Sequence, residues 1–224
     1  MREGAGNAIS AEAEMRPFRG TKSGRRFLLA KGAEADVYAG RLLGMPAVFK
    51  VRKPKAYRIA QIDGPLRAAR TRKEARLLHQ AKSGGALCPL VLRVGEYEIV
   101  MERLRGKLMR EEKEGKLAGI AGRAGKLLAQ IHGAGITHGD FTPANIIVDG
   151  GRAAVIDFGL GEFGIDDEER ATDVLLMKKS LSKRAYGRFI ASYQKARGPQ
   201  SRATLARLKE IELRGRYVVR GALA

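Results

Sequence analysis

The sequence HGDFTPAN at residues 138–145 and the sequence DFG at residues 157–159 decide the fold of this chain. Two β-rich runs lie between them, joined by the turn residues DGG at 149–151, which is a strong hairpin signal. A tight hairpin brings its two ends together, so we expect Asn145 and Asp157, just outside those ends, to point at one spot. Mg²⁺ prefers such hard oxygen ligands and takes only one or two of them from protein. The stretch therefore predicts a magnesium site.

Asp140 lies on the loop that leads into the hairpin, five residues before Asn145. There it is placed to accept a proton from an attacking hydroxyl or to orient a water. The order His-x-Asp-x-x-x-x-Asn, hairpin, Asp-Phe-Gly resembles the catalytic loop and metal-binding Asp of protein kinases. Asp, Asn and Gly also favour turns and caps. A role in turns alone, however, does not explain why the loop motif, the hairpin and Asp-Phe-Gly follow one another at the spacing of a kinase. The resemblance predicts Mg²⁺ and ATP as cofactors, Asp140 as a catalytic residue, and Asn145 and Asp157 as metal ligands.

A kinase also needs a lysine on its third strand and a helical carboxylate to hold it. Lys50 follows Val48-Phe49, as in the Val-Ala-Ile-Lys signature, and would contact the α- and β-phosphates. Glu74, in a predicted helix, is its natural partner. Lone Lys and Glu side chains are usually solvated, and Glu96 and Glu98 compete with Glu74, but the order of the motifs favours the pair Lys50 and Glu74.

The candidate phosphate-covering loop is AKGAEADV at residues 30–37, which keeps only the middle glycine of Gly-x-Gly-x-x-Gly-x-Val. Alanine can still approach phosphate but lacks the backbone freedom of glycine. We expect valines to face the adenine, a methionine to stand at the gate, and the backbone of the hinge, residues 102–104, to hold the adenine edge. The predicted nucleotide-binding residues are Gly32, Ala33, Glu34, Ala35, Val37, Val48, Lys50, Met101, Glu102, Leu104, Asn145 and Asp157.

Strand signals dominate the first half of the chain and helix signals the second. Short β-rich runs occupy residues 27–51 and 90–103, and an apolar stripe predicts a helix over 66–82. A second stripe, at 120–131, predicts a helix before the hairpin, and residues 167–213 are mostly helical in pattern. This is the α+β pattern of a domain with two lobes.

The fold class expected is therefore α+β, a bilobal protein-kinase-like fold. Residues 25–104 form a β-rich N-terminal lobe, and residues 105–224 form a small, mostly helical C-terminal lobe with a basic tail. Residues 1–24 are rich in Gly, Ala, Arg and Ser and are read as a flexible arm. Only a short stretch from Leu160 to Asp167 follows Asp-Phe-Gly, so no extended activation segment is expected.

The bulk composition indicates a chain that contacts polyanions in a reducing compartment. The formal net charge is +19, from 43 Lys+Arg against 24 Asp+Glu. Such an excess favours nucleic acid contact, although an acidic protein partner would also satisfy it. The single cysteine, Cys88, excludes an internal disulfide and fits the cytoplasm. No apolar run approaches the roughly 18 residues of a membrane span.

Four runs of sequence together resemble one family, the small atypical kinase/ATPase subunit of the KEOPS (EKC) complex, known as the p53-related protein kinase family and related to the RIO kinases. The match covers roughly residues 25–216. The runs are GAEA at 32–35, KVRKPKAYR at 50–58 with Asp63 and Leu66, RTRKEAR at 70–76, and HGD to Asn145 with DFG at 157–159 and ATD at 171–173.

This resemblance implies an ATPase and serine/threonine kinase that supports tRNA N6-threonylcarbamoyladenosine synthesis. The implied partners are the KEOPS-type subunits, including the one that transfers the threonylcarbamoyl group, and tRNA, directly or through the complex. Autophosphorylation is known in the family, and the acceptor could be water, the chain itself or another protein. Asp173 would brace the catalytic loop. The tail after Arg216 is less basic than is common, which leaves its role in tRNA-stimulated turnover open.

Three other functions share part of these features. A RIO-type ribosome-assembly kinase keeps similar chemistry, but the runs at 50–58 and 70–76 favour KEOPS. An aminoglycoside-type phosphotransferase would need a larger C-terminal lobe with acidic pockets. A non-catalytic RNA-binding scaffold would be expected to lack Lys50, Asp140 or Asp157, and all three are present.

Two further groups of polar residues have competing interpretations. The cations at 52–58 (Arg52, Lys53, Lys55 and Arg58) could bind a phosphate backbone or simply solvate the exit of a strand. His132, just before Gly133, is expected to be a buried histidine at a helix end rather than a ligand.

Overall fold

The computed structural model describes residues 25–164 and 166–221, without the side chains of Ala60 and of residues 215–221. The expected N-terminal arm, residues 1–24, lies outside the described residues. The chain divides into two compact units, Met1–Arg72 with Val91–Arg103, and Lys73–Leu90 with Leu104–Ala224. Each is described here by itself.

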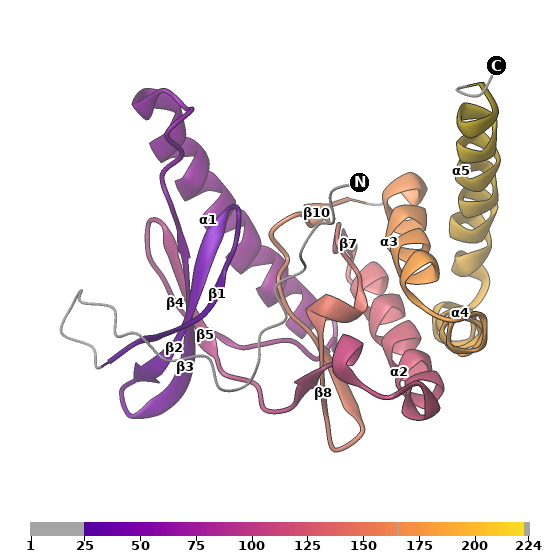
Figure 1. Cartoon of the computed structure of the whole chain (residues 1–224), viewed down its shortest axis with the longest axis horizontal. Coiled ribbons are helices and arrows are strands. Elements are labelled where there is room, and N and C mark those ends of the chain that lie inside the picture. The colour runs from indigo at the N-terminus through magenta and orange to yellow at the C-terminus, as the bar shows by residue number, and fades with distance from the viewer. Residues whose placement is uncertain (1–24, 165, 222–224) are drawn as a thin grey trace, which may run out of the picture. The chain divides into compact units, whose positions relative to one another are not determined.

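The first unit is built on a five-stranded antiparallel sheet, coloured from indigo at β1 to magenta at β4 and β5 in Figure 1. The strand order is β1-β2-β3-β5-β4. The predicted β-rich runs at 27–51 and 90–103 are confirmed, because β-branched and aromatic residues alternate along them and turn residues separate them. The bounds are β1 Phe27–Lys31, β2 Ala35–Leu42, β3 Met45–Arg52, β4 Val91–Val94 and β5 Glu98–Glu102.

The two faces of this sheet carry different residues because side chains alternate along a strand. Ala47, Phe49 and Val100 are fully buried on one face and form the core, against which Tyr38 packs. The guanidinium of Arg26 lies 3.8 Å from the centre of the Phe49 ring. The other face therefore remains for the predicted nucleotide-binding residues.

Helix α1, Ala60–Ser83, begins in the first unit and ends in the second. The helix predicted over 66–82 is confirmed, but the expected start was wrong, because the helix begins at Ala60 and includes Pro65. Pro65 has no N–H to donate, so the helical hydrogen bond that would end on the carbonyl of Gln61, four residues earlier, is missing. The amides of Ile62 and Asp63 both bond to the carbonyl of Ile59, which fixes the earlier start.

Among the described residues, the second unit contains short strands around the hairpin, four long helices and the end of α1. The predicted hairpin is confirmed: β8 and β9 pair antiparallel, with Ile146 opposite Val155. The short strands are β6 Lys107–Leu108, β7 Ile136–Thr137, β8 Ile146–Asp149, β9 Arg152–Val155 and β10 Glu162–Phe163. The long helices are α2 Glu114–Gly133, α3 Asp167–Ser180, α4 Lys183–Arg197 and α5 Ser201–Gly221.

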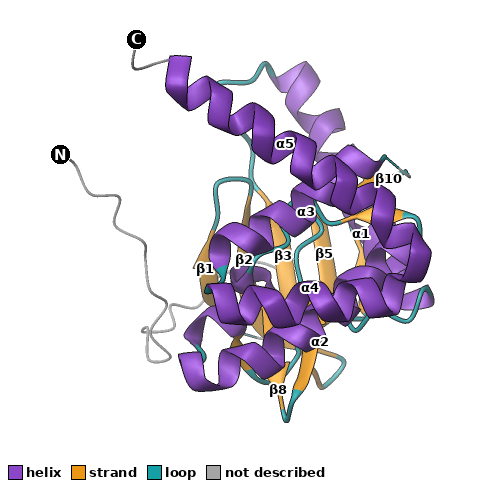
Figure 2. Ribbon diagram, turned by 90° about the vertical axis from the view of Figure 1, so that its right-hand side faces the viewer, coloured by secondary structure: helices purple, strands orange, loops and turns teal. Residues whose placement is uncertain are grey.

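Helices α2 and α4 lie side by side, as Figures 1 and 2 show. Glycine makes this approach possible, since a Cβ on Gly125 of α2 would stand 2.1 Å from the carbonyl oxygen of Phe189 on α4. Apolar residues of α2, among them Leu128 and Ile131, are buried, as the predicted stripe requires. The predicted helix at 120–131 is confirmed.

Among residues 25–164 and 166–221, no helix is both long and apolar enough to cross a membrane.

Candidate active site

Asp140 and Asn145 are joined directly, as the loop pattern requires. The Nδ2 of Asn145 donates to the Oδ2 of Asp140 at 2.8 Å and to its backbone carbonyl at 2.9 Å. A short 3₁₀ turn, Pro143–Asn145, places the amide, with the Asn145 N–H bonded to the Thr142 carbonyl at 3.0 Å. Because both amide hydrogens are directed at Asp140, the Oδ1 of Asn145 is the atom left to bind a cation.

Asp157 follows the other arm of the same hairpin. The N–H of Ile156 donates to the carbonyl of Asn145 at 2.9 Å, so the residue preceding Asp157 is bonded to the backbone of the other predicted ligand. The structure thus brings Asn145 and Asp157 to one end of the hairpin. Asp157 is exposed and has φ = +64°, a conformation that non-glycine residues adopt at a cost and that is common at functional sites.

His138 links the two arms of this arrangement. Its Nδ1 lies 3.2 Å from the N–H of Asp140, and its Nε2 lies 3.0 Å from the carbonyl of Ile156. An N–H must donate and a carbonyl must accept, so the ring is the neutral tautomer with its proton on Nε2. The ring is fully buried against Phe141 and Phe158. His138 therefore ties the backbone at Asp140 to the backbone just before Asp157.

Asp173, on α3, braces the catalytic loop, as the resemblance implied. Its Oδ2 accepts from the N–H of His138 at 2.8 Å and its Oδ1 from the N–H of Gly139 at 2.9 Å. The Nε2 of His132 lies 3.2 Å from the same Oδ2. All three bonds end on one fully buried carboxylate, so charge-assisted hydrogen bonds hold the loop in place.

His132 is a buried histidine near the end of α2, as predicted. Its Nδ1 lies 2.9 Å from the hydroxyl of Tyr193 on α4, opposite the contact with Asp173. Burial lowers the pKa of His132 from its ordinary value of 6.5, and this outweighs the opposing effect of Asp173. The neutral ring therefore donates to Asp173 and accepts from Tyr193.

Gly139 and His138 have structural roles that the motif pattern did not reveal. Gly139 has φ = +80°, and a Cβ there would stand 2.2 Å from the carbonyl oxygen of Leu160. No side chain fits this position. The only sign of this role in the sequence was the glycine itself, between His138 and Asp140. The close approach of the Leu160 carbonyl is a contact between residues far apart in the chain, which a local sequence pattern does not reveal.

The first unit places four of the predicted nucleotide-binding residues, Val37, Val48, Lys50 and Met101, on one face of its sheet. Lys50 on β3 is opposite Val37 on β2 and Ile99 on β5, and Val48 is opposite Met101. Opposite residues in a pleated sheet share a face. Lys50 is 8% exposed, which is unusual for a lysine.

The retained glycine of the phosphate-covering loop has a geometric reason. The N–H of Gly32 bonds to the carbonyl of Ala35 at 3.0 Å, and a Cβ on Gly32 would stand 2.6 Å from that oxygen. The turn therefore excludes any side chain at Gly32, whereas Ala33 and Ala35 are tolerated beside it.

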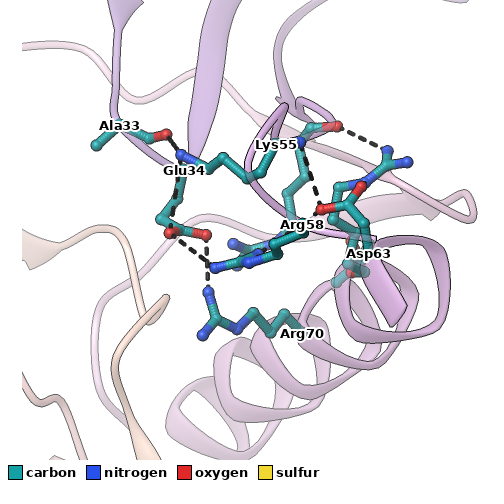
Figure 3. A network of polar contacts seen from close by, with 9 residues as sticks. Ala33, Glu34, Lys55, Arg58, Asp63 and Arg70 are labelled. Carbon is teal, nitrogen blue, oxygen red and sulfur yellow. Dashed lines mark hydrogen bonds and ion pairs between the residues drawn. The ribbon is translucent and has the colours of Figure 1, made fainter. Parts of the chain in front are cut away.

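Glu34 of this loop is held by cations of its own unit (Figure 3). Its carboxylate lies 2.7 Å from the guanidinium of Arg70, 3.8 Å from that of Arg58 and 3.9 Å from the Nζ of Lys55. The Nζ of Lys55 also donates to the carbonyl of Ala33. The cations after β3 thus anchor the phosphate-covering loop, a function beyond the two that the sequence suggested.

The remaining predicted residues are divided between the units. Glu74 is 1% exposed and lies in the part of α1 that belongs to the second unit, whereas Lys50 lies in the first. Glu102 is exposed at the end of β5, and Leu104 follows it two residues later, outside the strand. Their roles toward a nucleotide stay predictions.

Comparison with known proteins identifies similar chains. The family model described as the phosphotransferase enzyme family matches residues 133–211. A probable bifunctional tRNA threonylcarbamoyladenosine biosynthesis protein of Methanothermobacter thermautotrophicus is 41% identical over 196 residues, which cover 85% of this chain and 36% of that protein. The KEOPS complex subunit Bud32 of Pyrococcus abyssi is 35% identical over 211 residues, which cover 85% of this chain and 96% of that one. This chain therefore spans about a third of the bifunctional relatives.

Solved structures with the same fold are more distant. An aminoglycoside-3′-phosphotransferase of type VIII has a TM-score of 0.61 at 16% identity, covering 82% of this chain and 90% of that chain. The Rio2 kinase of Chaetomium thermophilum, in an ADP/Mg²⁺-phosphoaspartate complex, has a TM-score of 0.58 at 17% identity, covering 81% and 69%. At these identities the likeness shows the fold alone, and it confirms the predicted α+β, protein-kinase-like fold.

Proposed function

The chain belongs to the Bud32 family of KEOPS-complex kinases, and from this premise we propose that it is a Mg²⁺-dependent ATPase and atypical serine/threonine kinase that supports tRNA N6-threonylcarbamoyladenosine modification. One observation carries the proposal: the side chain of Asn145 is bonded to Asp140, and its carbonyl accepts from the N–H of Ile156, the residue before Asp157. This is the arrangement that phosphoryl transfer needs, a carboxylate for the nucleophile beside oxygen ligands for a cation.

The side chains present fit a magnesium ion. The Oδ1 of Asn145 and the carboxylate of Asp157 are both hard oxygen donors, and Mg²⁺ takes its remaining ligands from phosphates and water. Asp157 already accepts from the N–H of Gly159 at 3.0 Å through Oδ1, which fixes the orientation of its carboxylate. When bound, the ion would neutralise the charge that develops on the phosphates.

Asp140 would act on the nucleophile. Its Oδ2 accepts from Asn145, and its backbone is held by His138, so the carboxylate is positioned before substrate arrives. It would orient a water or a Ser/Thr hydroxyl for in-line attack on the γ-phosphate and accept its proton. By the family resemblance, Lys50 would hold the α- and β-phosphates, and Glu74 would hold Lys50. Glu34 would act indirectly, by keeping the phosphate-covering loop on its cations.

The biological setting is proposed from the relatives. One is named a KEOPS complex subunit and another a tRNA threonylcarbamoyladenosine biosynthesis protein. We infer that this chain works in the cytoplasm, in a KEOPS-type complex with the subunit that transfers the threonylcarbamoyl group, and with tRNA. The predicted basic tail begins at Arg214, whose guanidinium lies 3.3 Å from the carboxylate of Glu168. The structure does not describe the side chains of the tail residues that follow.

The first test is ATP turnover by the purified chain with Mg²⁺, alone and then with the transferase subunit and tRNA. We expect strong stimulation by the partner and tRNA, and loss of turnover in Asp140→Ala and Asp157→Ala. The control is Asp149→Ala, which removes an exposed carboxylate at the other end of the same hairpin and should keep its activity. Normal turnover in Asp157→Ala would refute the metal assignment.

A further inference from the structure

The second unit has a groove along α2 and α4 that the proposed catalysis does not use. We call it the basic groove. Its walls are five exposed cations, namely Arg123 and Lys126 on α2 and Arg184, Arg188 and Lys195 on α4. The cavity measures about 770 Å³ and is open to solvent. Figure 2 shows α2 and α4 next to each other.

The floor of the basic groove is made of small residues. Gly115, Gly119 and Gly122 of α2 line the groove together with Ser192 and Ala196 of α4. A Cβ on Gly122 would stand 3.1 Å from the Oγ of Ser192, whereas Cβ atoms on Gly115 and Gly119 would meet nothing within 4 Å. The glycines therefore leave open space between the two rows of cations, so a ligand backbone can approach the helices.

The five cations lack carboxylate partners among the residues that the structure describes. No salt bridge joins them to an acid, and no acidic residue lines the basic groove. Glu114, at the start of α2, is hydrogen-bonded to the hydroxyl of Ser182. The cations after β3 are different, because Glu34 and Asp63 balance them.

This arrangement is unfavourable for an isolated chain. Arg184 and Arg188 are four residues apart on one helix face, and like charges at that spacing destabilise a helix. Lys195 continues the same face two turns later, and Arg123 and Lys126 repeat the pattern on α2. A polyanion would relieve this repulsion and release its own counterions.

We propose that the basic groove binds the phosphate backbone of RNA. The inference rests on the proposed role in tRNA modification for its choice of RNA, and it names the face that this role would use. An acidic protein segment fits less well. Protein interfaces depend on buried aromatic and Met anchors and are poor in Lys, whereas the lining of this groove contains Gly, Ala, Ser, Arg and Lys. Protein–nucleic acid interfaces are polar and strongly positive.

The length of the basic groove suits a run of phosphates. From Gly115 to Lys126 the helix rises about 16 Å at roughly 1.5 Å per residue. Several successive phosphates of one RNA strand pass over a length of this size, so the groove is long enough for more than one cation to contact the same backbone.

The test measures binding of fluorescently labelled bulk tRNA to the full chain at several salt concentrations. The groove variant is Arg184→Gln/Arg188→Gln/Lys195→Gln. The matched control is Lys179→Gln/Arg202→Gln/Lys209→Gln, which removes three exposed cations from α3 and α5. Losing three phosphate contacts should lower the slope of log K against log [salt] by about 2–3 and weaken binding about a hundredfold at 0.1 M salt. Basal ATP turnover should stay unchanged in both variants.

The outcomes separate this inference from the proposed function, because tRNA binding does not require turnover. A groove variant that loses affinity and salt dependence, with a control that keeps them, supports the basic groove even if no tRNA modification is found. Equal loss in both variants would show that net charge alone binds RNA and would overturn the proposal. Unchanged tRNA binding with lost binding of polyglutamate would overturn it in favour of an acidic protein, and absence of tRNA binding by the unmodified chain would overturn it outright.

Discussion

Asp173→Asn is the substitution that most directly tests how the catalytic loop is held. The change keeps the shape of the side chain but replaces one carboxylate oxygen by an NH₂ group. The carboxylate accepts from His138 and Gly139 and contacts His132. Whichever way the new amide turns, its NH₂ group faces at least one N–H donor. That donor and the NH₂ group itself are then left without an acceptor.

The expected cost follows from these contacts. A buried donor without a partner costs about 1–3 kcal/mol, and the remaining bonds lose their charge assistance. Some of this is offset because a buried charge no longer has to be desolvated. We expect a net loss of about 3 kcal/mol in the free energy of unfolding, a large part of the roughly 5–15 kcal/mol of a typical domain. With a urea m-value of about 1–3 kcal/mol/M, the midpoint should fall by about 1–3 M.

The assay is urea unfolding followed by circular dichroism at 222 nm, because the chain contains no Trp for fluorescence. Asp149→Asn is the matched control, since it makes the same chemical change at an exposed position. ATP turnover, measured well below the unfolding transition, should fall in Asp173→Asn as well, because the loop that carries Asp140 loses its brace. A midpoint within about 0.3 M of both the unchanged chain and the control would refute the reasoning.

Two further predictions concern the helices that support the site. Gly125→Ala should destabilise the chain by about 1–3 kcal/mol, because its Cβ would stand 2.1 Å from the carbonyl of Phe189 and overpacking exceeds the helix-propensity gain of about 1 kcal/mol. Gly119→Ala, whose Cβ meets nothing within 4 Å, is the control and should be neutral or stabilising, and equal urea midpoints for both variants would contradict this. Burial lowers the pKa of His132 below 6.5. Below about pH 6.5 the unfolded chain therefore binds a proton on this histidine more readily than the folded chain does. The free energy of unfolding should fall as the pH drops through this range. His132→Gln should weaken this pH dependence, measured as urea midpoints near pH 7.5 and 5.5, and an unchanged dependence would mean that other groups cause it.

Local sequence predicted the elements that depend on neighbouring residues. The hairpin followed from two β-rich runs around DGG, and the helix at 120–131 from its apolar stripe, because turn chemistry and periodicity act over a few residues. The adjacency of Asn145 and Asp157 followed from the hairpin, because a tight turn leaves its ends little freedom. The kinase-like fold and the family followed from the order of the motifs along the chain.

Other features arise from contacts between residues far apart in the sequence, and no pattern displays these. The start of α1 at Ala60, before Pro65, depends on the bonds from the amides of Ile62 and Asp63 to the carbonyl of Ile59. Glu34 was predicted from the loop alone, and only the fold shows that Arg70 holds it.

The sequence by itself determined which residue types this protein brings to its candidate active site, because chemistry fixes the ligands that a cation and a nucleophile require. The tertiary structure decided how those residues are held. The tautomer of His138, the absence of any side chain at Gly139 and the open basic groove on α2 and α4 depend on where distant backbone atoms come to lie. Close packing sets those positions across the whole unit, and a linear pattern does not record them.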